Sequence, residues 1–254
     1  MLRRAQYRMS EDELLSTHLG SLFIGGKIAN HRSILRRFLR DHLPDETITE
    51  EIENAICLLK RELGMLPHQH TRLEIMGVEG YSANIYFGVF KHLILNPEFQ
   101  FEKRSKRPPK DEVNALLSFF YTLLAHDVRA ALETVGLDAY VGFLHTDRPG
   151  RPSLALDLME ELRGYLVDRF VLSVINKRQI HKNDFIVQGE NGYLIHEDTR
   201  KELISMWQKR KKDVITHPFL QEKIPIGLLP YAQAQLLSRF LRGDIDNYPV
   251  FLFT

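Results

Sequence analysis

Residues 143–164 read FLHTDRPGRPSLALDLMEELRG and join a histidine, a turn and an acidic helix within one stretch. His145 precedes a turn rich in proline and glycine, and the leucines that follow have helical spacing, which predicts a helix over 152–171. Asp157 and Glu160 stand three residues apart, so this helix carries both on one side. Two close carboxylates without solvent repel each other, and a proton, a cationic side chain or a metal ion must compensate them.

Taken alone, these acids leave two interpretations open. In the first, Glu160 and Glu161 lie on a solvated face and pair with Arg163 or Arg169, since surface ion pairs are common and weak. In the second, the acids form a metal site with His145, because imidazole nitrogen and carboxylate oxygens are usual ligands for Mn²⁺, Zn²⁺ or, more weakly, Mg²⁺.

Helical spacing extends from this stretch to most of the chain. Apolar residues at steps of three and four predict further helices at about 11–39, 49–63, 72–95, 110–134, 198–212 and 226–242. Ser10 followed by Glu13 fits a capping box for the first of them. FIVQGENGYLIH predicts a small β-hairpin around residues 184–196. We therefore expect a mainly α fold, a single helical domain with one hairpin.

The composition is ordinary for a soluble globular protein, with 254 residues, 44% apolar and 26% charged. No run approaches the roughly 18–20 apolar residues of a membrane span, and no apolar segment behind the N-terminus suggests a secretory signal. Cys57 is the only cysteine, which suits a reducing compartment, and we expect a cytoplasmic protein. A net charge of +1 does not mark a nucleic-acid binder, so such a role depends on where positive charge gathers.

A second acidic element is LEIMGVEGYSANIYFGVF, residues 73–90. Glu79 stands between Gly77 and Gly80 in a helical apolar run, and each glycine costs a helix interior about 1 kcal/mol relative to alanine. A close approach of a phosphate backbone or of another helix can offset that cost. Tight helix packing, with Glu79 as an isolated charge, is the alternative interpretation.

Several segments in order closely resemble the CRISPR-associated adaptation integrase, the first-numbered Cas protein. They are GVEGYSANIYF, RPPKDEVNALLSFFYTLL, VGLDAYVGFLHTDRPGRPSLALDLMEELR and NYPVFLF, and the resemblance runs from GGKIANHRSIL at residue 25 onward. The resemblance implies a metal-dependent DNA endonuclease and integrase that inserts prespacer DNA into the repeat array. In this chemistry a 3′-hydroxyl attacks a backbone phosphate by transesterification, and disintegration and hydrolysis use the same site.

The resemblance also implies the residues of the site. Glu79, His145 and Glu160 are expected to bind Mg²⁺ or Mn²⁺, with Asp157 as an adjacent catalytic carboxylate. Many family members carry aspartate where this chain has Glu160. Both are hard oxygen ligands, so we expect function to survive, with the ion shifted slightly by the longer side chain.

Basic residues that can neutralise DNA phosphates gather before the 110–134 helix. A solvated face is the alternative for any such cluster. The candidate DNA-binding residues, including one aromatic ring for base stacking, are Lys103, Arg104, Lys106, Arg107, Lys110, Arg163 and Tyr81. Further basic clusters are Arg32, Arg36 and Arg40, and Lys209 to Lys212.

The expected partners are double-stranded and branched DNA and the second-numbered Cas protein, with no membrane. Family members usually begin with an N-terminal β-rich domain that carries much of the dimer interface. This chain begins with RRAQYRMSEDE, so we interpret residues 1–10 as a linker or remnant of that domain and 11–254 as the helical integrase domain. Homodimers are implied for the full-length family, and for this chain the oligomeric state stays open.

Two other functions remain possible at this point. His126-Asp127 supplies the dipeptide of an HD-type metal phosphohydrolase on a predicted helix, and further ligands are available from His68, His70, His92 and His145. A non-catalytic helical DNA-binding scaffold subunit would keep the basic clusters and lack the metal.

Overall fold

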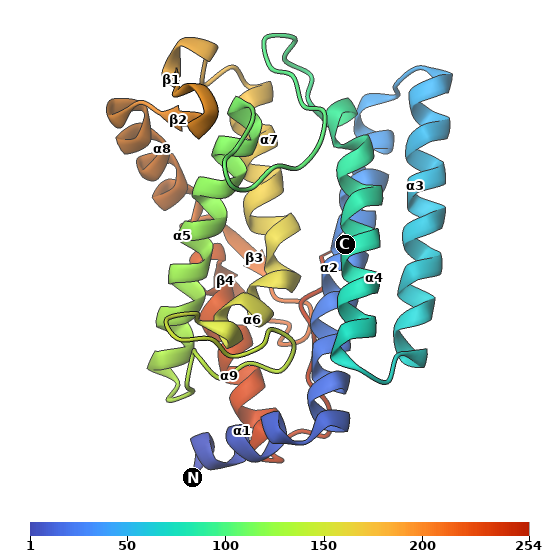
Figure 1. Ribbon diagram of the computed structural model, residues 1–254, viewed down its shortest axis with the longest axis vertical. Coiled ribbons are helices and arrows are strands. Elements are labelled where there is room, and N and C mark those ends of the chain that lie inside the picture. The colour runs from blue at the N-terminus through green and yellow to red at the C-terminus, as the bar shows by residue number, and fades with distance from the viewer. Residues whose placement is uncertain (254) are drawn as a thin grey trace.

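Helix α2 (Glu13–His42) is the central element of the computed structural model, which describes residues 1–253 (Figure 1). Asp12 caps its start by accepting a hydrogen bond from the Leu15 N–H at 3.0 Å. Buried side chains follow α2 along most of its length, so neighbours must cover it on more than one side. Helices α3 (Glu46–Met65) and α4 (Arg72–Val89) pack on one side and α6 (Ser153–Arg163) on another.

The remaining helices form a second group beside α6 (Figure 1). Helix α6 continues through a π-helical turn (Gly164–Asp168) into α7 (Arg169–Asn176), which makes one helical rod. Helix α5 (Glu112–Thr134) packs against both α6 and α9 (Leu229–Leu241). Helix α8 spans Glu197–Arg210, and 3-10 turns lie at Leu66–His68, Phe90–Leu93, Lys182–Asp184, Gly189–Asn191 and Ile226–Leu228.

The predicted fold class is confirmed, and the hairpin forms where it was expected. Strand β1 (Phe185–Val187) pairs antiparallel with β2 (Tyr193–Ile195). A second antiparallel pair, β3 (Val214–Thr216) with β4 (Lys223–Pro225), was not predicted. Its strands have three residues each, as in the first pair, but the connecting residues HPFLQE lack the Gly-Glu-Asn-Gly signal that predicted the first turn.

Residues 1–10, interpreted from the sequence as a linker or remnant, lie mostly in helix α1 (Leu2–Glu11). The buried Gln6 side chain explains its position, because its Nε2 donates to the carbonyls of Asp138 and Val141 at 2.8 Å each. The predicted capping box at Ser10 is wrong, since Ser10 lies within α1 and Asp12 is the N-cap of α2. Helix α1 thereby fixes the segment that leads to His145.

Helix α5 is long and apolar enough to cross a membrane by length and composition alone. In the fold its apolar residues Leu116, Leu117, Phe120 and Leu124 are fully buried. It packs against α6 and α9, so its apolar character is that of a core helix.

The C-terminal segment is held between α2 and α6 by a buried polar network. Asn30 Nδ2 donates to the carbonyls of Glu161 at 2.7 Å and Phe251 at 2.9 Å. Glu161 accepts hydrogen bonds from the Phe251 N–H at 2.6 Å, from Gln233 Nε2 at 3.0 Å and from the Tyr248 hydroxyl. Burial raises the pKa of Glu161 to about 7 although these three donors oppose the rise. The expectation that Glu161 lies on a solvated face is therefore wrong.

Gly26 permits the close contact between α2 and this C-terminal segment. A Cβ atom at Gly26 would overlap Val250 Cγ1 and lie 3.0 Å from Glu161 Cβ. At the neighbouring Gly25 a Cβ would make ordinary contacts, at 3.6 Å from Leu66 and 3.7 Å from Leu63. The two adjacent glycines therefore have different packing constraints.

We expect Gly26→Ala to destabilise the protein by about 1–3 kcal/mol, because overpacking forces the C-terminal segment away from α2. Gly25→Ala is the matched control and should leave stability unchanged or slightly raised, since alanine favours the helix. Adding Val250→Ala to Gly26→Ala should recover part of the loss. Urea unfolding of the four proteins measures this, and equal stability of the two glycine variants would contradict the packing described.

Candidate metal centre

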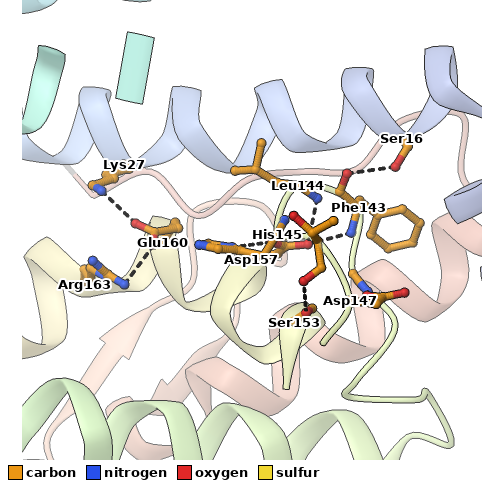
Figure 2. Close-up of polar contacts among 12 residues, drawn as sticks. Ser16, Lys27, Phe143, Leu144, His145, Asp147, Ser153, Asp157, Glu160 and Arg163 are labelled. Carbon is orange, nitrogen blue, oxygen red and sulfur yellow. Dashed lines mark hydrogen bonds and ion pairs between the residues drawn. The ribbon is translucent and has the colours of Figure 1, made fainter. Parts of the chain in front are cut away.

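Asp157 holds the loop that carries His145 against the start of α6 (Figure 2). Its Oδ2 accepts hydrogen bonds from the N–H groups of Phe143 at 2.6 Å and Leu144 at 3.0 Å. Its Oδ1 accepts from the His145 N–H at 2.9 Å and pairs with His145 Nδ1 at 2.6 Å. A carboxylate oxygen can only accept, so Nδ1 carries the proton and the lone pair of a neutral ring is on Nε2, the usual arrangement in a histidine ligand.

Gly142 makes this loop possible. A Cβ atom there would lie 2.8 Å from both Asp157 Oδ2 and Ser153 Cβ, too close for any other residue without a shift. Ser153 adds a hydrogen bond from its hydroxyl to the Thr146 carbonyl at 3.1 Å. The turn thus folds His145 back over the helix start, as the sequence suggested.

Glu160 lies one turn further along α6 and is bound by two cationic side chains. Its Oε1 pairs with Arg163 Nη2 at 2.8 Å and its Oε2 lies 2.8 Å from Lys27 Nζ. Burial alone would raise the pKa of the Glu160 carboxyl, but the charges of Arg163 and Lys27 outweigh it and lower that pKa to about 2. Glu160 is therefore a buried carboxylate that stays ionised.

Glu79 and Glu160 face the same nitrogen atom from different helices. Lys27 Nζ, from α2, also pairs with Glu79 Oε1, from α4. The two carboxylate oxygens are thus no more than two hydrogen-bond lengths apart. His145 lies between Asp157 and Glu160 in Figure 2, close enough for a charge on its ring to lower the pKa of Glu160.

The Lys27 ammonium therefore occupies the cation position between Glu79 and Glu160. Within residues 1–253, no group of three or more histidine, cysteine or acidic side chains is arranged to hold a metal ion as it stands. The chemistry of the donors nevertheless fits one. Glu160 Oε2 is buried and receives no well-directed hydrogen bond, and His145 Nε2 is the free ring nitrogen. Mg²⁺ and Mn²⁺ favour such oxygen donors, and Mn²⁺ also takes imidazole.

Two cavities meet beside this acidic pair. One of about 350 Å³ is lined by Lys27 and Glu79 and includes Lys103 and Lys106. The other, of about 820 Å³, we call the arginine cleft; its basic lining residues are Arg107, His126, Arg129, Arg148, Arg151 and Arg163. Tyr121 and Arg163 line both cavities, so the side chain that binds Glu160 also faces the arginine cleft. Arginine is well suited to phosphate oxygens through its planar set of donors.

Comparison with known proteins identifies the family. Residues 1–209 match the family model described as CRISPR associated protein Cas1. The chain belongs to the Cas1 family. It is 50% identical over 255 residues to CRISPR-associated endonuclease Cas1 1 of Chlorobaculum tepidum, covering 100% of this chain and 74% of that protein. It is 44% identical to CRISPR-associated endonuclease Cas1 of Leptospira interrogans, with both chains covered in full. The chain is thus a CRISPR-associated endonuclease of adaptation.

Solved structures agree on the fold. A Cas1 protein from Thermotoga maritima matches 95% of this chain and 72% of its own, with a TM-score of 0.79 at 22% identity. A casposase bound to integration product matches 97% of this chain and 66% of its own, with a TM-score of 0.83 at 22% identity. At this identity the likeness extends to the fold alone.

The predicted DNA-binding residues of this Cas1 chain divide into three groups. Lys103, Lys106 and Arg107 border the two cavities. Lys110 and Tyr81 are exposed but lie outside both linings.

The third group is two arginines that line the smaller cavity and are bound to other side chains of the protein. Arg104 donates to Asn114 Oδ1 at 2.7 Å and Ser118 Oγ at 3.0 Å, which orders the basic loop. Arg163 is bound to Glu160.

Sequence reasoning missed Lys27 and the cleft residues Arg129, Arg148 and Arg151 as members of the site. The available signal for Lys27 was a lysine within the apolar helical run of GGKIAN. A lysine in that setting needs a buried counter-charge, because an unpaired ammonium is costly to bury.

The HD-type alternative is not supported by the positions of its residues. Asp127 pairs with Lys211 Nζ at 2.5 Å, and His126 lines the arginine cleft. Because the chain belongs to the Cas1 endonuclease family, we keep neither the HD-type phosphohydrolase nor the non-catalytic scaffold as its function.

We expect Asp157→Asn to destabilise the protein by about 2 kcal/mol or more, because the new amide group meets backbone donors that need acceptors. Asp147→Asn is the matched control from the same loop, since Asp147 accepts a single hydrogen bond, from Gly142 N–H at 3.2 Å. Thermal unfolding of both variants checks this. A control as unstable as Asp157→Asn would show that the four bonds do not organise the loop.

Proposed function

We propose that this Cas1 chain joins prespacer DNA to a CRISPR repeat by metal-dependent transesterification at Glu79, His145 and Glu160. The observation that carries the proposal is the meeting of two carboxylates from different helices at one cation position, beside a histidine whose Nε2 is free. These three side chains would hold Mg²⁺ or Mn²⁺, which polarises a phosphoryl oxygen and lowers the pKa of an attacking hydroxyl.

The chain's own residues have separate tasks in this reaction. Asp157 fixes the ring of His145 through Nδ1, so we assign it a positioning role. Arg163 bonds Glu160 and lines the arginine cleft, so it can connect the acidic pair with a phosphate in the cleft. The arginines of the cleft neutralise successive phosphates and hold the strand in line for attack.

The proposal extends to the binding partners, the location and the domain boundaries of the chain. One structural neighbour is a partial Cas6-RT-Cas1–Cas2 complex, with 25% identity, a TM-score of 0.84 and coverage of 98% of this chain and 72% of its own. We propose double-stranded and branched DNA as substrates, a Cas2-type protein as partner and the cytoplasm as location. Residues 11–254 are proposed as the catalytic unit, with 1–10 leading into it.

We expect His145→Ala to lower strand transfer and disintegration on branched DNA with Mn²⁺ by at least about 100-fold, because the ion loses its nitrogen ligand. His68→Ala is the control, since His68 is exposed and outside both cavities. His68→Ala should unfold at the temperature of the unaltered protein, and His145→Ala should remain folded at the assay temperature although it loses the bond to Asp157 Oδ1. Full activity of His145→Ala would exclude the site proposed.

We expect Arg148→Ala with Arg151→Ala to weaken DNA binding and to reduce the slope of log affinity against log salt by about 1–2, one unit for each lost phosphate contact. Lys201→Ala is the control, because Lys201 is exposed on α8 and pairs with Glu197 and Asp198. Fluorescence anisotropy over a salt series measures both. An unchanged slope in the double variant would mean that DNA does not occupy the arginine cleft.

A further inference from the structure

Lys27 is one of the most buried charged residues of the chain, with 3% of its side chain exposed. It lies on α2, and its Nζ pairs with Glu79 on α4 and with Glu160 on α6. The aliphatic part of a lysine can be buried at little cost, but its charged end normally reaches water. Here the charged end is directed at the two carboxylates proposed to bind metal.

The local charges balance without a metal ion. Arg163 and Lys27 together offset Glu160 and Glu79. In the ion pairs that the structure gives for residues 1–253, Lys27 is the cation that binds Glu79. Without the ammonium, Glu79 and Glu160 would repel each other across a short distance.

A divalent ion bound by the same two carboxylates would lie within a few ångström of Lys27 Nζ. Like charges at that distance repel strongly in a buried site. The ammonium and the metal ion therefore exclude each other from this position, although each stabilises the same pair of acids.

We propose that Lys27 is a positioning residue, an internal cation that holds Glu79 and Glu160 together before metal binds and is displaced from them when metal enters. This inference rests on the metal site of the proposed function and adds its regulation. In this role Lys27 keeps the two acids ordered when no metal is bound. It also sets the affinity for metal, because the ammonium competes with the ion.

The test is Lys27→Gln, which keeps a hydrogen-bond donor and removes the competing charge. Calorimetric titration with Mn²⁺ should show binding at least about tenfold tighter than in the unaltered protein, as expected for loss of one close buried charge. The melting temperature without metal should fall, and its rise on adding Mn²⁺ should be larger than in the unaltered protein. Lys106→Gln is the matched control, since Lys106 lines the same cavity without an ion pair to either acid in the described chain.

Unchanged or weaker Mn²⁺ binding in Lys27→Gln would overturn the inference. If Lys27→Gln does not fold, acylation of the unaltered protein followed by mass spectrometry decides the matter. Mn²⁺ should accelerate labelling of Lys27 relative to Lys106, and no acceleration would overturn the inference. Failure of the proposed function would give a different result. The change Glu79→Gln would then not remove any Mn²⁺ binding from the protein.

Discussion

The fold depends on the burial of three carboxylates on α6, a helix of only eleven residues. Asp157, Glu160 and Glu161 are each almost fully buried, and a buried charge must be paired or neutralised. The three acids have different partners. Backbone N–H groups of the His145 loop surround Asp157, cations from α2 and α6 surround Glu160, and α9 with the C-terminal segment surrounds Glu161. Pairing the buried acids of this one helix therefore fixes the positions of a loop, a neighbouring helix and the C-terminal segment.

Periodicity could predict most of this fold because the long helices bury continuous apolar stripes. It could not predict α1, whose position depends on the polar Gln6, or β3 and β4, which are held by a few backbone bonds. Within the candidate site, the sequence favoured a turn that returns His145 to its helix, and the structure has it. The burial of Glu161 and the pairing of Lys27 with Glu160 could not be predicted, because the contacting residues lie 87 and 133 residues apart in the sequence.

The wall between the two cavities depends on another buried acid, beyond the three of α6. Asp168, at the end of the π-helical turn, accepts a hydrogen bond from the Tyr121 hydroxyl at 2.5 Å. Two guanidinium groups lie over the Tyr121 ring, that of Arg163 at 4.8 Å from the ring centre and that of Arg104 at 5.5 Å. Such cation–π contacts are strengthened by exclusion of water. This arrangement keeps Arg163 beside Glu160 and leaves the arginine cleft open on its other side.

The separation of charge explains how a chain with a net charge of +1 can act on a polyanion. The two acids of the candidate site, Glu79 and Glu160, already have Lys27 and Arg163 as counter-charges. In the ion pairs of residues 1–253, the cleft residues Arg107, Arg148 and Arg151 pair with neither of these acids and can act on phosphates, whereas Arg129 pairs with Glu133. In the function proposed above, a phosphate backbone that approached Glu79 and Glu160 would meet a neutral cluster, and exchange of the ammonium for a divalent ion would make the same position attractive to it. The local field, and not the total charge, would then decide where a phosphodiester reacts.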